Sequence, residues 1–177
     1  LAGVVAETEA IARKALELIE IRCEVLKPVT DPFVALEPKA PKIHESGNIL
    51  SRSHVHRGDV EKALKTSAYV SKGRYTTQRV EHAFAEPEAC FAEPWDSSKK
   101  SGIKVFSQGQ GAYEDRKQIA KLLKLSEEQV NVIQVETGGG FGGKEDLTVQ
   151  GHAALYSYLT KTPVRIVLNR AESIRMH

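Results

Sequence analysis

The densest group of chemically capable residues is a glycine run that ends in a lysine and an acid. Positions 137–145 read TGGGFGGKE, with glycine at five of the six positions from 138 to 143. Glycine is costly to order and has no Cβ, so such a run between a strand and a helix indicates that another group approaches the backbone. Its amide N–H groups can cradle an anion or a polar cofactor at the N-terminus of the following helix. A tight turn used only for packing is the structural alternative.

Two general phosphate-binding patterns overlap this run, and each lacks a required residue. Positions 138–144 contain G-x-G-x-x-G, and they fit all but the last residue of the phosphate loop G-x-x-x-x-G-K-[ST]. The phosphate loop needs a hydroxyl for magnesium where this chain has Glu145. The dinucleotide pattern needs an acidic residue about 20 positions on, where this chain has Asn169 and Arg170. A nucleotide-binding module that uses the Gly138–Gly143 loop remains the alternative from a different class.

Phe141 stands at the crest of the run and is explained by neither phosphate pattern. An aromatic ring at the top of a glycine loop has no apolar core to enter. We therefore expect Phe141 to form a wall for a flat ligand.

The elements that must position the run follow from the periodicity of apolar residues. Alternating branched residues predict a strand at 130–135 immediately before the run, and helical spacing predicts a helix at 147–159 after it. The neighbouring segments predict strands at 88–92, 102–107 and 164–168, a helix at 113–125, and a capping box formed by Ser126 and Gln129. This mixture lacks a strict alternation of strands and helices, which predicts an α+β fold.

The N-terminal third is less regular. Thr8 is expected to cap a helix of about three turns that reaches Ile19, and a strand is expected at 21–25. Four prolines between Lys27 and Gly47 predict a linker with at most a helical turn at 33–36. A short helix capped by Asp59 and a strand at 68–77 should follow.

Composition excludes several kinds of protein. The chain has 25 Lys and Arg against 23 Asp and Glu, spread along its 177 residues, so no nucleic-acid partner is expected. No apolar run approaches the roughly 18 residues of a membrane span, and the first residues lack the pattern of a secretion signal. Cys23 and Cys90 lack metal-ligand spacing, which favours a reducing cytoplasm and predicts no zinc or iron–sulfur site in this chain.

Several motifs together resemble one family. The segment 138–145, GGGFGGKE, resembles the signature loop of the molybdenum hydroxylases, the xanthine dehydrogenase and aldehyde oxidase group. Similar matches extend over nearly the whole chain, at 4–9, 47–49, 57–60, 81–87 (EHAFAEP) and 106–111 (FSQGQG). The resemblance implies an internal fragment of the molybdopterin-binding subunit. Residues 1–26 would end the small leading, hammerhead-type domain, 27–57 would form a connector, and 58–177 would begin the molybdopterin-binding domain.

The resemblance also implies roles for individual residues. Of the two candidates Gln108 and Gln110, counting to Phe141 favours Gln110 as the glutamine whose amide lies beside the molybdenum. Phe141 would share the metal's environment and contact substrate. The pterin would lie against Gln110 and the loop residues Gly139, Gly140, Phe141 and Gly142. Glu145 would be a catalytic residue that faces the substrate and shares a ring proton of a purine. A plain acid at a helix N-terminus is the structural alternative for Glu145.

The family's chemistry sets expectations for the whole protein. It would hydroxylate xanthine, hypoxanthine or a similar N-heterocycle with water as the oxygen source, and an aldehyde is the alternative substrate. Segment 108–116 is more similar to bacterial xanthine or hypoxanthine hydroxylases than to carbon monoxide dehydrogenases. Molybdopterin, in a dinucleotide form, would be bound with the remainder of the chain, and iron–sulfur clusters and FAD would belong to partner subunits or domains. We expect the fragment alone to be inactive, because the family's catalytic glutamate and further pterin contacts lie C-terminal to the matched region.

Overall fold

The computed structural model describes residues 2–97 and 100–176. These residues form two compact units. The first, here called the linker unit, is Leu18–Thr77, and the second, the sheet unit, comprises Ala2–Glu17 and Gln78–His177. The candidate site lies wholly in the sheet unit.

A four-stranded sheet organises the sheet unit. Its strands are β1 (Ala89–Ser97), β2 (Lys100–Ser107), β3 (Val130–Gln134) and β4 (Val164–Val167), in the order β3-β2-β1-β4. β1 pairs antiparallel with both β2 and β4, whereas β2 and β3 are parallel. A sheet that mixes parallel and antiparallel pairs confirms the predicted α+β class.

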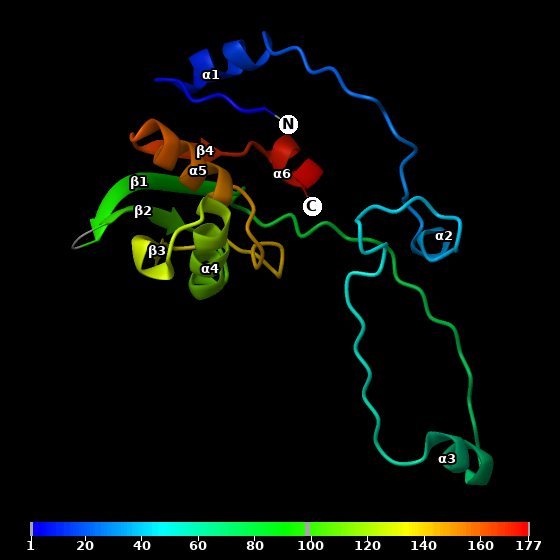
Figure 1. The fold of residues 1–177 in the computed structure, drawn as a ribbon. Coiled ribbons are helices and arrows are strands. Elements are labelled where there is room, and N and C mark those ends of the chain that lie inside the picture. The colour runs from blue at the N-terminus through cyan, green and yellow to red at the C-terminus, as the bar shows by residue number, and fades with distance from the viewer. Residues whose placement is uncertain (1, 98–99, 177) are drawn as a thin grey trace. The chain divides into compact units, whose positions relative to one another are not determined.

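Two helices cover one face of this sheet. α4 (Ala112–Leu123) makes the crossover between β2 and β3, and α5 (Gln150–Thr160) packs against β1 and β2 (Figure 1). The buried core between helices and strands comprises Cys90, Ala92, Ile103, Val105, Ile119, Ala120, Val130, Val149, Ala153 and Ala154. Because β2 and β3 are parallel, their carboxyl ends lie at the same edge of the sheet, where antiparallel β1 begins. The loops that leave β2 and β3 therefore meet the segment that enters β1.

The smaller elements of the sheet unit follow the sequence closely. α1 (Glu9–Leu16) is capped by Thr8, which accepts a hydrogen bond from the Ile11 amide at 3.3 Å, but it ends one turn earlier than predicted. The Gln129 side chain accepts from the Ser126 amide at 3.3 Å, which caps a short 3-10 turn at Glu127–Gln129 as predicted. α6 (Arg170–Met176) follows β4.

The linker unit contains two of the predicted helices and neither predicted strand. α2 (Pro32–Ala35) fits the expected helical turn, and Asp59 caps α3 (Val60–Thr66) by accepting from the Lys62 amide at 2.9 Å. The strands predicted at 21–25 and 68–77 are wrong, since both segments lack strand pairing. Alternating residues suit a pleated backbone, but a strand forms only where a neighbour completes its hydrogen bonds. In the described residues, no helix is long and apolar enough to cross a membrane.

Candidate functional site

Three chain segments converge where the parallel strands end. The first, 84–88, enters β1; the second, 108–110, leaves β2; and the third, 137–144, is the glycine loop that leaves β3. The Val135 amide donates to the Ser107 carbonyl at 2.9 Å, and Thr137 Oγ1 donates to the Gln108 carbonyl at 2.9 Å. The first contact of the glycine loop is thus with the segment that carries both candidate glutamines.

Gln110 is fastened to the glycine loop by its side chain and its backbone. Its Oε1 accepts from the amides of Gly142 at 3.0 Å and Lys144 at 3.2 Å. Its own amide donates to the Lys144 carbonyl at 2.8 Å. Within the described part of the chain, Gln110 Nε2 makes no hydrogen bond, and the residue is exposed. The carbonyl half of the amide is fixed, and the N–H half is left to donate outward.

Gly138 at the start of the loop is held by Glu86. Glu86 Oε2 accepts from the Gly138 amide at 2.6 Å, and the Glu86 amide donates to the Gly138 carbonyl at 3.2 Å. The pair is reciprocal, and a Cβ on Gly138 would lie 2.5 Å from the Glu86 Cβ. This close approach requires glycine at position 138.

The crest of the loop is bare backbone with one aromatic ring. Gly139 and Gly142 have φ of +95° and +96°, and Phe141 has φ of +53°. A positive φ is unusual for an aromatic residue, and the Phe141 side chain lies on the surface, 75% exposed. A Cβ on Gly142 would meet no atom within 4 Å. The crest therefore offers open space beside an exposed ring, and the expected pterin and substrate contacts there stay a prediction.

Lys144 is turned inward. The residue is 1% exposed, and its Nζ donates to the Glu86 carbonyl at 2.8 Å and to Gln108 Oε1. The same Nζ lies 4.4 Å from the centre of the Phe84 ring and 3.9 Å from Glu86 Oε2. Burial lowers the pKa of Lys144, and the negative charge of Glu86 partly offsets this. A phosphate-loop lysine would face its ligand, so this position argues against the nucleotide-binding alternative.

The loop amides argue in the same direction. The Gly138 amide donates to the Glu86 side chain, and the amides of Gly142 and Lys144 donate to the Gln110 side chain. Two further amides bond within the loop: that of Gly143 donates to the Gly140 carbonyl, and that of Glu145 donates to the Gly142 carbonyl. The predicted helix at 147–159 also begins late, at Gln150, so these amides do not lie at a helix N-terminus. An anion cradle of the phosphate-loop kind needs free amides at a helix N-terminus.

Glu145 is exposed and lies five residues before α5. That distance removes the alternative in which Glu145 serves as the acid of a helix first turn, because the dipole effect is confined to that turn. Its carboxylate stands on the surface just after the loop.

Gln108 is a buried structural amide. It is 4% exposed, its Nε2 donates to the Pro87 carbonyl at 3.1 Å, and its Oε1 accepts from Lys144. Gln108 therefore joins the segment before β1 to Lys144, and it cannot reach outward.

A buried polar network under the 108–110 segment was missed by sequence reasoning. Ser107 Oγ donates to Asp115 Oδ2 at 2.7 Å and accepts from the Gly109 amide at 2.9 Å and from Gln150 Nε2 at 3.2 Å. Asp115 is fully buried, and that burial raises its pKa, although the Ser107 hydrogen bond opposes the shift. The spacing of Asp115 from Ile119 on the helix was the available signal, because residues four apart share a face.

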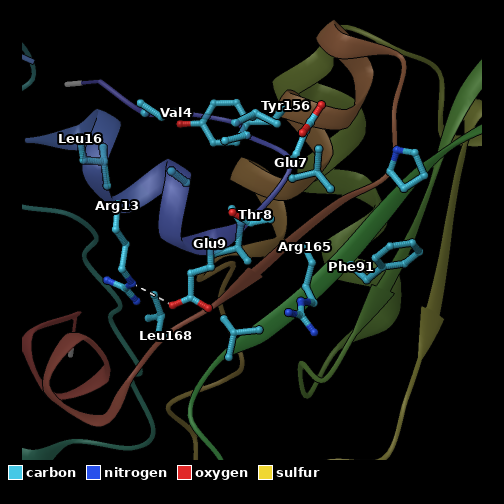
Figure 2. Close-up of a pocket in the computed structure, with 18 of the residues that line it drawn as sticks. Val4, Glu7, Thr8, Glu9, Arg13, Leu16, Phe91, Tyr156, Arg165 and Leu168 are labelled. Carbon is cyan, nitrogen blue, oxygen red and sulfur yellow. Dashed lines mark hydrogen bonds and ion pairs between the residues drawn. The ribbon is translucent and has the colours of Figure 1, made fainter. Parts of the chain in front are cut away.

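A cavity of about 510 Å³ lies elsewhere in the sheet unit. Its lining comes from the N-terminal segment, α1, β4 and neighbouring side chains such as Phe91 and Tyr156 (Figure 2). Arg13 on its rim bonds Glu9 at 2.8 Å and Glu172 at 3.0 Å. No residue of the glycine loop lines this cavity. Among the described residues, no group of three or more His, Cys, Asp or Glu side chains is placed to hold a metal ion.

Comparison with known proteins identifies the family. The sequence model of the molybdopterin cofactor-binding domain matches residues 43–177. The chain belongs to this family. It is 38% identical over 175 residues to a probable xanthine dehydrogenase subunit of Bacillus subtilis, covering 99% of this chain and 23% of that protein. It is 39% identical over 173 residues to the nicotinate dehydrogenase large molybdopterin subunit of Eubacterium barkeri, covering 98% of this chain and 40% of that protein.

Solved structures agree with this assignment. Quinoline 2-oxidoreductase from Pseudomonas putida 86 matches 95% of this chain and 21% of its own chain, with a TM-score of 0.76 and 27% identity. The aldehyde oxidoreductase from Desulfovibrio gigas, at 24% identity, matches 97% of this chain and 19% of its own with a TM-score of 0.84, which shows the shared fold. The chain spans less than half the length of each of these relatives.

Proposed function

We propose that this chain forms one wall of the active site of a molybdenum hydroxylase that acts on a purine or a similar N-heterocycle. The observation that carries the proposal is the fixed Gln110 amide beside the exposed Phe141 ring. Gln110 Oε1 accepts from two loop amides, so its N–H₂ group is directed away from the loop. An oriented amide donor and an aromatic wall suit a cofactor-bound planar substrate.

The bound cofactor supplies the metal centre at which a substrate carbon is hydroxylated with oxygen from water. Gln110 Nε2 would donate a hydrogen bond beside that centre. The backbone of Gly139, Gly140 and Gly142 would contact the pterin, with open space beside Gly142, and Phe141 would pack beside the heterocycle. Glu145 accepts or shares a ring proton as charge builds on the substrate, a role open to an exposed carboxylate.

The substrate class is supported by the names of the relatives. Xanthine, nicotinate and quinoline are named for three of the enzymes similar to this chain, and each is an N-heterocycle. An aldehyde substrate is the second candidate, since the aldehyde oxidoreductase from Desulfovibrio gigas shares the fold. Glu145 favours the heterocycle, because an aldehyde offers a carboxylate little to bind.

The whole protein is proposed to work in the cytoplasm with the remainder of its own chain. Iron–sulfur and flavin subunits or domains would carry electrons away from the site, and the pterin would be a dinucleotide form. The segments 1–26, 27–57 and 58–177 are proposed as the end of the leading domain, the connector and the start of the molybdopterin-binding domain. The fragment alone should be inactive, because one wall does not enclose a cofactor.

The test uses the complete parent protein with its natural partners. Molybdenum content and the hydroxylation of hypoxanthine, xanthine and an aromatic aldehyde are measured in the wild type, Gln110→Ala and Glu145→Ala. Asp146→Ala is the matched control, because Asp146 is the exposed acid next in the chain. Purine turnover that collapses in Glu145→Ala with molybdenum retained would support the proposal.

Two other outcomes would overturn it in part or in full. Aldehyde turnover that is insensitive to Glu145→Ala would keep the molybdenum site and reject the purine. A parent protein without molybdenum would reject the function itself.

A further inference from the structure

We propose that Lys144 is a positioning residue that sets the direction of the Gln110 amide. The inference rests on the proposed function, because Gln110 matters to catalysis only if it lies beside the cofactor. Lys144 is 1% exposed, and its side chain is directed inward to Glu86, Gln108 and Phe84. Its effect on the reaction must pass through Gln110.

The backbone of Lys144 holds Gln110 directly. Its amide donates to Gln110 Oε1 at 3.2 Å, and its carbonyl accepts from the Gln110 amide at 2.8 Å. The Gly142 amide, two residues earlier, makes the other bond to Oε1 at 3.0 Å. The direction of the Gln110 amide therefore follows the position of backbone 142–144.

The side chain of Lys144 fixes that backbone. Its Nζ reaches across to the Glu86 carbonyl at 2.8 Å and to Gln108 Oε1. The aliphatic stem ends over the Phe84 ring, with Nζ 4.4 Å from the ring centre. Contacts with Glu86 and Phe84 in segment 84–88, and with Gln108 in segment 108–110, thus hold Lys144 in place.

The loop needs such an anchor because its own residues provide few. Gly142 and Gly143 have no side chains, and Phe141 is exposed, so nothing else between Gly140 and Lys144 packs into the core through a side chain. Glycine segments lose more conformational freedom on ordering than others. Without the ammonium group, the hydrogen bonds to Gln110 alone, among those of the described residues, would tie residues 142–144 to another segment, beside the bonds that the loop makes within itself.

Lysine suits the position chemically. An ammonium group has three donors, and two carbonyl oxygens accept from it here, with Glu86 Oε2 3.9 Å away. A neutral apolar side chain would leave the Glu86 carbonyl and Gln108 Oε1 without this donor. The two glutamines thus hold Lys144 at different points, Gln108 at the side chain and Gln110 at the backbone.

The test compares Lys144→Met with wild type in the complete parent protein. Amide hydrogen exchange is followed in the peptide covering 138–146, together with molybdenum content and steady-state kinetics. Met nearly keeps the length of the stem and removes the ammonium. We expect exchange in this peptide to rise roughly tenfold and kcat to fall roughly tenfold, with KM and molybdenum content little changed. Lys144→Arg, which keeps a cation and its donors, should restore part of kcat.

Ser157→Ala is the matched control for loss of a buried hydrogen bond. Ser157 is fully buried in α5 and donates to the Thr162 carbonyl at 2.8 Å, away from the loop. Its loss should leave exchange in 138–146 and kcat at wild-type values. If Lys144→Met fails to fold, Gln108→Leu removes the side-chain acceptor of Lys144 and should change exchange and kcat in the same direction.

The outcomes separate this inference from the proposed function. Unchanged exchange in 138–146, or faster exchange with full kcat in a molybdenum-loaded enzyme, overturns the positioning role. Faster exchange in a parent that binds no molybdenum supports the link from Lys144 to Gln110 while the proposed function fails.

Discussion

Adding one methyl group at Gly140 should displace the Gln110 amide without unfolding the protein. A Cβ at position 140 would overlap Gln110 Oε1 and lie 2.8 Å from its Cδ. Gly140 does not have a positive φ, so alanine introduces no backbone strain there. The overlapping atoms belong to the end of a flexible side chain, which can swing away.

The magnitude follows from the bonds that would be lost. Gln110 Oε1 accepts two amide hydrogen bonds, and each contributes about 0.5–1.5 kcal/mol net to stability. Gly140→Ala should therefore destabilise the protein by about 1–3 kcal/mol. If the misplaced amide costs about 2 kcal/mol in the transition state, kcat falls about thirtyfold.

The assay measures hydroxylation by the molybdenum-loaded parent protein. Gly111→Ala is the matched control, because a Cβ there meets only the Glu114 Cβ at 3.9 Å and φ is an ordinary −146°. Gly111→Ala should keep wild-type kcat, and Gly140→Ala should match Gln110→Ala. Full kcat in Gly140→Ala with normal molybdenum content would refute the role given to Gln110.

Three further outcomes concern buried groups. Ser107→Ala should lower the free energy of unfolding by about 1–3 kcal/mol, because a buried acceptor loses its donor; an unfolding midpoint equal to that of exposed Ser101→Ala would contradict this. Burial raises the pKa of Asp115 above its ordinary 3.8, so the folded state binds this proton more tightly than the unfolded state. Its stabilising contribution is complete below that value and is lost as pH rises through the folded pKa. Urea titrations between about pH 4 and 8 should therefore show a free energy of unfolding that falls less steeply with pH in Asp115→Asn than in the wild type. Parallel plots of this free energy against pH for the two proteins would be inconsistent with the raised pKa. Burial also raises the pKa of Cys90 to about 12. Iodoacetamide at about pH 8 should therefore label exposed Cys23 and spare Cys90 in the native protein, as measured by peptide mass spectrometry. Equal labelling of the two cysteines would show that the Cys90 thiol is not buried.

The sheet unit could be predicted from sequence because its signals are local. Alternating residues marked β2 and β3, and the apolar spacing after Tyr113 marked α4. The start of α5 was predicted too early for a physical reason. Leu147 and Val149 pack on the core from a loop, so their apolar side chains extend the hydrophobic segment back beyond the first residue of the helix.

Long-range partners account for what could not be predicted. The segments 21–25 and 68–77 alternate like strands, yet a local pattern does not reveal whether a neighbouring strand exists. The proximity of Gln110 to the glycine loop follows from two parallel strands that end together. The inward turn of the Lys144 side chain does not, because the pairing of the strands does not determine which side chains of the following loop point into the protein.

The distance in sequence between the glycine loop and Glu86 has a consequence for synthesis on the ribosome. The contact from Lys144 to Glu86 spans 58 residues, and that from Gly138 to Glu86 spans 52. At about 5–20 residues per second, roughly 3–12 s pass between the addition of Glu86 and that of Lys144. During that interval the apolar Phe84 ring lacks the lysine whose Nζ later lies 4.4 Å from the ring centre. The three segments of the candidate site are therefore joined only after the whole glycine loop has been synthesised.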